Sequence, residues 1–336
     1  MKYFFSAILF LLTACSIKAQ DNYAQKYDAA HKLLMQGDLE KASAAYTELL
    51  QKHGDSLEVL KDWVFINILI NNFTKAAEVG KLMIERPDAD EQCFQLLGMS
   101  YKSTKEYKEC DNVYKKALKK FPNSGVIYNE MGELGALQKN LPEAIVSWEK
   151  GIEADANYSS NYYNAVMYYD RFENNFKTII YGEQFLNLES YTTRSADIKS
   201  AVYDAYVRIY TEKDPQNWIR STASDFEKAF FTTLSKSIAL AKDGINPENL
   251  SSIRTRFVLD WFASGKNEKL PFYLFNYQQY LLQEGLFDAY NQWMFGPAVS
   301  TAAYKIWVDT HDKQAAAFRK YQQSHIMKFP AGQYYK

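Results

Sequence analysis

Small residues recur at a fixed interval through the first half of the chain. They stand at the same place in four short junctions, at Ala42, Ala76, Cys110 and Ala144. The interval is about 34 residues each time, which is a period typical of stacked helix-turn-helix units. One such unit cannot bury its own apolar face, so neighbouring units must pack into a continuous core. The interval therefore predicts an all-α solenoid, and it constrains the fold more tightly than any bulk property of the sequence.

The third copy shows the most complete pattern. It contains Leu97-Gly98, Tyr101, Tyr107, Cys110, Tyr114, Ala117 and Pro122. This arrangement resembles the tetratricopeptide repeat (TPR) family, which implies a right-handed superhelix of four to five repeats. We expect repeats at about 23–56, 57–90, 91–124 and 125–158, and a degenerate fifth at 159–192. In the fifth copy Phe176 falls one place late, which indicates a one-residue insertion at its turn.

The resemblance also implies a binding surface. In TPR proteins the first helix of each repeat lines a concave groove, and the matching positions here hold aromatic, aliphatic, amide and charged side chains. The groove residues predicted in this way are Tyr27, His31, Lys61, Phe65, Gln95, Met99, Asn129, Glu133, Tyr163 and Arg171. Such a mixed surface suits an extended peptide or a partner helix. It departs from the lysine and asparagine constellation with which chaperone-binding TPR proteins hold a terminal carboxylate.

Residues 1–19 have the pattern of an export signal. Lys2 precedes a short apolar run that is not long enough to remain as a membrane-spanning helix. Two cleavage sites are open. The segment Leu12-Thr13-Ala14-Cys15 resembles a bacterial lipobox, which implies lipidation of Cys15, whereas Ile17-Lys18-Ala19 fits ordinary cleavage after Ala19. The sequence thus predicts an exported protein that is either periplasmic or anchored to the outer membrane by lipid.

The repeat period is lost from about residue 193, but helix signals continue to the end of the chain. Asn246-Pro247 is a strong helix start. Gly296-Pro297 is expected to stop a short helix that begins at Leu286, and one long helix is expected from about residue 298 to 327. No segment alternates as a strand does. Residues 193–336 are therefore predicted to form a non-repeating helical domain that caps the repeats.

The segment 270–296 is dense in aromatic residues. Its nine rings belong to Phe272, Tyr273, Phe275, Tyr277, Tyr280, Phe287, Tyr290, Trp293 and Phe295. Two explanations remain open at this point: packing within a core, and an exposed aromatic patch for a protein partner or a sugar.

The net charge and the lack of known catalytic motifs argue against several functions. The net charge of -1 offers no attraction to nucleic acid or to an anionic membrane. The sequence has no recognisable nucleophile, phosphate-binding or metal-ligand motif, so we predict no enzyme activity, metal or cofactor. Cys93 and Cys110 are predicted to be free, buried thiols, because their places in the repeat are too far apart for a disulfide.

Two functions are consistent with these observations. The first is an exported scaffold or adaptor of the bacterial cell envelope that binds a protein or peptide partner in the TPR groove, with membrane contact only through a lipid anchor at Cys15. The alternative is a glycan-binding component that uses the aromatic C-terminal half.

Overall fold

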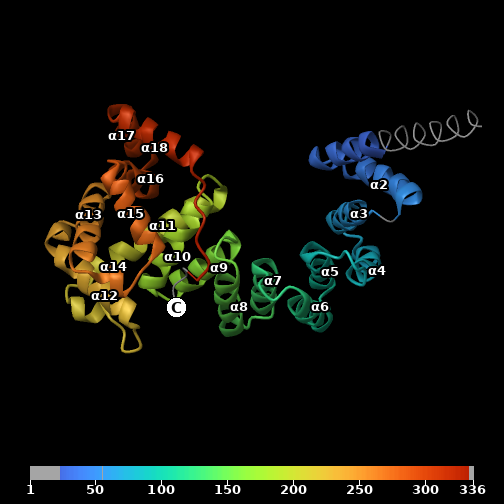
Figure 1. Cartoon of the computed structure of the whole chain (residues 1–336), viewed down its shortest axis with the longest axis horizontal. Coiled ribbons are helices and arrows are strands. Elements are labelled where there is room, and N and C mark those ends of the chain that lie inside the picture. The colour runs from blue at the N-terminus through green and yellow to red at the C-terminus, as the bar shows by residue number, and fades with distance from the viewer. Residues whose placement is uncertain (1–22, 55, 333–336) are drawn as a thin grey trace, which may run out of the picture. The chain divides into compact units, whose positions relative to one another are not determined.

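The computed structural model of the protein describes residues 23–54 and 56–332. Contacts divide the chain into two compact units, residues 1–139 and 140–336. All regular elements within the described ranges are helices, which confirms the predicted fold class (Figure 1). None of the helices in these ranges is long and apolar enough to cross a membrane. The predicted export signal and Cys15 lie outside the described residues.

The first unit is a series of helix pairs. Its first helix spans residues 23–35 and is followed by α2 (Leu39–His53), α3 (Leu57–Leu69), α4 (Phe73–Ile84), α5 (Glu91–Thr104), α6 (Tyr107–Lys120) and α7 (Gly125–Leu137). We call the first helix of each repeat its A helix and the second its B helix. The A helices of repeats two, three and four are α3, α5 and α7, and these three contact one another in order.

One residue in the left-handed backbone conformation sets the turn between the A and B helices. Positive φ angles recur once in each repeat, at Gly37, Asn71, Lys105, Lys139 and Glu173. At the first of these turns the N–H groups of Gly37 and Asp38 donate to the carbonyls of Leu34 and Leu33, at 3.0 Å each. This pair of return bonds ends the A helix and reverses the chain.

The fifth repeat keeps the same spacing, so the predicted one-residue insertion is wrong. Glu173, with a φ of 53°, lies one full repeat period after Lys139. Helix α10 (Asn175–Leu188) begins the same period after α8 (Leu141–Ala154). Compared with the earlier repeats, only the large apolar side chain at the start of the B helix stands one position later. Asn175 occupies the first position of the B helix, and Phe176 follows it and is fully buried.

The A and B helices of repeat three pack closely against each other. Gly98 of α5 faces Tyr114 of α6, and a Cβ atom at residue 98 would overlap the Tyr114 ring. The small side chain of Cys110 is also fully buried, and its Sγ lies 3.4 Å from the carbonyl oxygen of Gly98. Cys93 and Cys110 are both free and buried, as predicted. Burial raises the pKa of the Cys110 thiol to about 11, so it stays protonated near neutral pH.

The second unit continues the repeat before departing from it. Helix α8 is the B helix of repeat four, and α9 (Ser159–Arg171) pairs with α10 as repeat five. Helix α11 (Thr193–Thr211) begins one repeat period after α9 and packs on α10. The period therefore extends one helix past residue 193, where the sequence analysis placed its end. Helix α11 continues through Val207, the position of the next turn, because a β-branched residue disfavours the left-handed conformation.

The remaining helices complete the second unit. They are η1 (Pro215–Trp218), α12 (Asp225–Leu234), η2 (Ser235–Ala241), α13 (Pro247–Ala263), α14 (Lys266–Lys269), α15 (Tyr273–Gln283), α16 (Phe287–Val299), α17 (Thr301–Thr310) and α18 (Asp312–Ser324). Two predicted boundaries were wrong. Helix α16 runs through Gly296-Pro297, since a proline this near the helix end removes a hydrogen bond only from the last turn. The predicted long last helix is divided at His311, whose φ of -121° and ψ of 40° are not helical.

Most of the aromatic segment 270–296 is core. Six of its nine rings are buried, and Tyr280 is the only one that is more than 40% exposed. The buried rings are Phe272, Phe275, Phe287, Tyr290, Trp293 and Phe295. Packing therefore explains this composition better than an exposed patch does.

A buried ion pair joins repeat five to the non-repeating helices. Glu183 of α10 and Arg254 of α13 form a salt bridge in which the side chains are only 2% and 3% exposed. The same carboxylate oxygen accepts hydrogen bonds from Gln278 at 2.7 Å and Tyr290 at 2.8 Å. The C-terminal segment also returns to the loop between α8 and α9, because the Phe329 backbone exchanges two hydrogen bonds with the Asn157 side chain (Figure 1).

We expect the substitution Gly98→Ala to lower the free energy of unfolding by about 1–2 kcal/mol, although alanine favours helices more than glycine does. The reason is that overpacking a helix contact costs about 1–3 kcal/mol, whereas the gain in helix propensity is at most about 1 kcal/mol. Urea denaturation of Gly98→Ala, Tyr114→Leu and the double variant measures the coupling between the two sites. The cost of Gly98→Ala should largely vanish when it is combined with Tyr114→Leu, and strictly additive effects would contradict the close contact.

Candidate functional site

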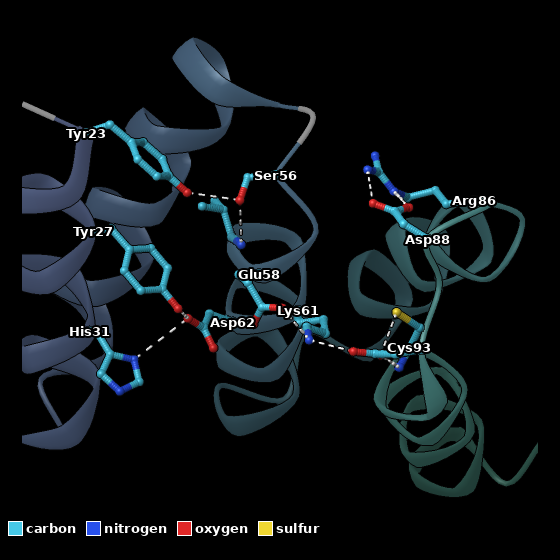
Figure 2. Close-up of polar contacts among 12 residues, drawn as sticks. Tyr23, Tyr27, His31, Ser56, Glu58, Lys61, Asp62, Arg86, Asp88 and Cys93 are labelled. Atoms are coloured by element: carbon cyan, nitrogen blue, oxygen red, sulfur yellow. Dashed lines mark hydrogen bonds and ion pairs between the residues drawn. The ribbon is translucent and has the colours of Figure 1, made fainter. Parts of the chain in front are cut away.

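Side chains from neighbouring A helices of the first unit meet along one face (Figure 2). Between the first helix and α3 they converge on Asp62. Its Oδ2 accepts hydrogen bonds from Tyr27 at 2.7 Å and from Tyr46 of α2 at 2.8 Å. The His31 imidazole lies 3.7 Å from the same oxygen. Burial, followed by the Asp62 contact, raises the pKa of Tyr27, so this phenol remains a hydrogen-bond donor.

Lys61 links α3 to α5. Its Nζ lies 2.7 Å from Glu58 and 2.8 Å from Asp90, and its side chain is only 6% exposed (Figure 2). Asp90 also caps α5, because its Oδ1 accepts the backbone N–H of Cys93 at 3.1 Å. Burial acts to lower the pKa of Lys61, but the two carboxylates outweigh it and raise the pKa. Lys61 is therefore a charged lysine held below the surface.

Glu130 links α5 to α7 in the same way. This carboxylate is buried and accepts hydrogen bonds from Gln95 at 2.9 Å, Lys102 at 2.5 Å and Tyr114 at 2.9 Å. The Lys102 ammonium also pairs with Glu133 at 2.9 Å. Burial opposes the charge of Lys102, yet the two glutamates raise its pKa. We refer to the polar contacts around Asp62, Lys61 and Glu130 as the A-helix ladder.

The cations and the carboxylates of the A-helix ladder differ in how far their side chains are exposed to solvent. The cations Lys61 and Lys102 are 6% and 12% exposed, whereas the carboxylate side chains of Glu58, Asp90 and Glu133 are 64%, 46% and 42% exposed. The accessible part of the ladder is therefore mainly anionic.

Most of the predicted groove residues of the first unit take part in this face. Tyr27, His31, Gln95 and Glu133 belong to the A-helix ladder, and the half-buried Phe65 and Met99 pack against the core from α3 and α5. Two residues need a correction as partner contacts: Lys61 and Asn129 are buried. Lys61 is held by Glu58 and Asp90, and the Asn129 amide donates to Glu133 at 3.0 Å.

The other two predicted groove residues belong to the second unit. Tyr163 is half-buried on α9, where the Arg194 guanidinium lies 5.0 Å from its ring centroid. Arg171 is exposed at the end of the same helix. Neither residue is part of the A-helix ladder.

Asp62 and Glu130 accept most of the ladder's hydrogen bonds, and neither was predicted as a site residue from the sequence. A signal for them was present. Each lies 16 residues after a tyrosine at the same place in the repeat, as Tyr46 precedes Asp62 and Tyr114 precedes Glu130. A B-helix tyrosine therefore donates to an acid on the A helix of the next repeat. Within the described ranges no group of three or more His, Cys, Asp or Glu side chains is placed to hold a metal ion.

No family model and no curated protein matches the sequence. Solved structures with a similar fold include a tetratricopeptide repeat protein from Parabacteroides merdae, at 13% identity and a TM-score of 0.41, covering 74% of this chain and 93% of that one. Another is YrrB, described as a TPR protein with an unusual peptide-binding site, at 17% identity and a TM-score of 0.35, covering 52% and 90%. A third is MamA from Desulfovibrio magneticus, at 16% identity and a TM-score of 0.38, covering 50% and 93%.

This likeness concerns the fold alone. The TPR architecture itself is evident from the chain's own helix pairs, from their left-handed turns and from the constant spacing between them.

We expect Glu130→Gln to lower the free energy of unfolding by about 2–4 kcal/mol, because it leaves the mostly buried Lys102 with Glu133 as its one remaining carboxylate. The matched control is Glu85→Gln, which breaks the exposed pair of Glu85 with Lys116 at 2.5 Å. Exposed pairs contribute about 0–1 kcal/mol, so the control should change stability by less than that. Denaturant titration compares the two variants, and equal effects would show that Glu130 is not an integral part of the fold.

Proposed function

We propose that the protein is an exported adaptor of the cell envelope and that its first unit binds an extended, basic segment of a partner protein along the A-helix ladder. The observation that carries this proposal is the unequal exposure of the ladder's charges. Its lysines are held beneath the surface by neighbouring carboxylates, while Glu58, Asp90 and Glu133 keep 42–64% of their side chains accessible.

The chemistry of a fitting partner follows from this exposure. Lysine or arginine side chains of a bound segment would form ion pairs with the accessible carboxylates, which occur at intervals along the A helices. Apolar side chains of the segment would pack against the half-buried Phe65 and Met99. Lys61 holds Glu58 and Asp90, and Lys102 holds Glu133, in place before binding, which reduces the entropy lost on association. Accessible negative charge also speeds the encounter with a basic partner at low ionic strength.

The proposal of an exported adaptor rests on residues 1–19, whose charged start and short apolar run are typical of export signals. Either cleavage site places the repeats on the outer side of the inner membrane. Lipidation at Cys15 adds an anchor. The glycan-binding alternative receives little support, because six of the nine rings in segment 270–296 are buried in the core.

Site-specific photocrosslinking tests the proposed face. A photoreactive phenylalanine analogue introduced at residue 65 or 99 in cells of the native species should form adducts with the same partner protein. The yield of adducts should fall when extracts are irradiated at about 1 M salt instead of at low salt, since the Debye length then falls to about 3 Å. Mass spectrometry of the adduct identifies the crosslinked segment, which should be rich in lysine or arginine.

Leu82 provides the matched control for this experiment. It is 71% exposed on the B helix α4, which contains none of the ladder residues. The same analogue at residue 82 should not capture the partner. Equal capture at all three positions, or a crosslinked segment that is acidic, would argue against binding along the ladder.

Mass measurement of the mature N-terminus tests the proposed anchor. Cleavage at the lipobox predicts a chain that begins at Cys15 and carries the added mass of acyl chains, and Cys15→Ser should then release the protein from the membrane fraction. A chain that begins at an unmodified Gln20 would contradict lipidation while leaving export intact.

A further inference from the structure

The second unit contains a cavity of about 390 Å³ where α11, α16, α17 and α18 meet. Its walls are largely aromatic and include Trp293, Tyr304, Trp307 and Phe318. Gly296 permits this arrangement, because a Cβ atom there would lie 2.6 Å from the Tyr304 ring. Ligand sites in proteins are commonly lined by apolar and aromatic side chains and have volumes of about 300–1,000 Å³. The cavity therefore has the size and the lining of a small-molecule site.

A buried lysine lines this cavity. Lys199 of α11 is 8% exposed, and its ammonium lies 4.1 Å from the centroid of the Trp293 ring. Among the described residues no carboxylate pairs with this ammonium and no group forms a hydrogen bond with it. Burial lowers its pKa to about 8. A buried cation without a counter-charge is costly, and the ring of Trp293 compensates for only part of its lost hydration.

The rest of the lining adds positive charge and no negative charge. Arg319 of α18 is exposed at the edge of the cavity and forms no ion pair within the described ranges. The titratable or charged groups of the lining are those of Tyr191, Lys199, Tyr304 and Arg319, and none is a carboxylate. Burial raises the pKa values of both tyrosines, which therefore stay neutral near pH 7.

We propose that this cavity binds a small organic anion, whose flat apolar body packs between the aromatic walls and whose negative group pairs with Lys199 and Arg319. The ligand would supply the counter-charge that Lys199 does not receive from the described residues. This proposal is independent of the partner surface on the first unit, since all residues involved lie on the second.

Two dyes of nearly the same shape test the proposal on the purified full chain. The first, 1-anilinonaphthalene-8-sulfonate, carries a sulfonate that remains ionised across the pH range used. The second, N-phenyl-1-naphthylamine, has the same ring body without the charge. Fluorescence titration at pH 7 should show saturable binding of the anionic dye at one site, tighter than binding of the neutral dye.

Substitution of the two cations then assigns the site. Lys199→Met keeps the length of the side chain and removes its charge, so affinity for the anionic dye should fall about tenfold or more while affinity for the neutral dye stays similar. Arg319→Gln, at an exposed position, should weaken the anionic dye less. Lys213→Met, an exposed lysine outside the cavity, is the matched control and should change neither affinity.

The pH dependence provides a second readout. In the native protein, affinity for the anionic dye should be highest below pH 8 and should fall as Lys199 loses its proton at higher pH. Lys199→Met should remove this fall. The same substitution should raise the thermal denaturation midpoint at pH 7, because it removes an unpaired buried charge. Equal dye affinity in the native protein and Lys199→Met, a pH profile that the substitution leaves unchanged, or failure of the native protein to bind the anionic dye would each overturn the proposal.

Discussion

The first unit depends on the close approach of the two helices within each repeat. Gly98 shows the constraint directly, since the Tyr114 ring occupies the space that any side chain at residue 98 would need. The left-handed turn residue, which recurs once per repeat, ends each A helix at the point where the B helix must begin. With both conditions met, the A helices of successive repeats pack side by side, and the polar face exists only because they do.

Side-by-side A helices bring side chains together that are about one repeat apart in the sequence. Tyr27 reaches Asp62, Lys61 reaches Asp90, and Gln95 reaches Glu130. Each contact satisfies a group that burial would otherwise penalise, so the ladder stabilises the stack as well as shaping its surface. Because Lys61 and Lys102 are more buried than Glu58, Asp90 and Glu133, the same contacts leave the accessible surface anionic. Stability and the proposed recognition of a basic partner thus share one set of residues.

The second unit shows what happens when the period ends. Helix α11 starts in register but runs past the expected turn at Val207, and the later helices follow at irregular spacing. Strong polar contacts such as Glu183 with Arg254 then replace the repeat interface. The cavity beside Lys199 lies among these irregular helices, where no repeated pattern of small and large side chains dictates the packing.

Sequence patterns were sufficient to predict the all-α class, the repeat spacing, the free buried thiols and most helix starts, because these depend on local signals at fixed intervals. The register of repeat five shows the limit of that reasoning: one displaced aromatic, Phe176, suggested an insertion, whereas the backbone turn at Glu173 kept its place. The folded structure was needed to show which lysines are buried, that Arg254 meets a glutamate 71 residues away, and that Lys199 has no counter-charge among residues 23–54 and 56–332. These outcomes depend on which side chains of distant helices share a low-dielectric space, and no local pattern in the sequence specifies that.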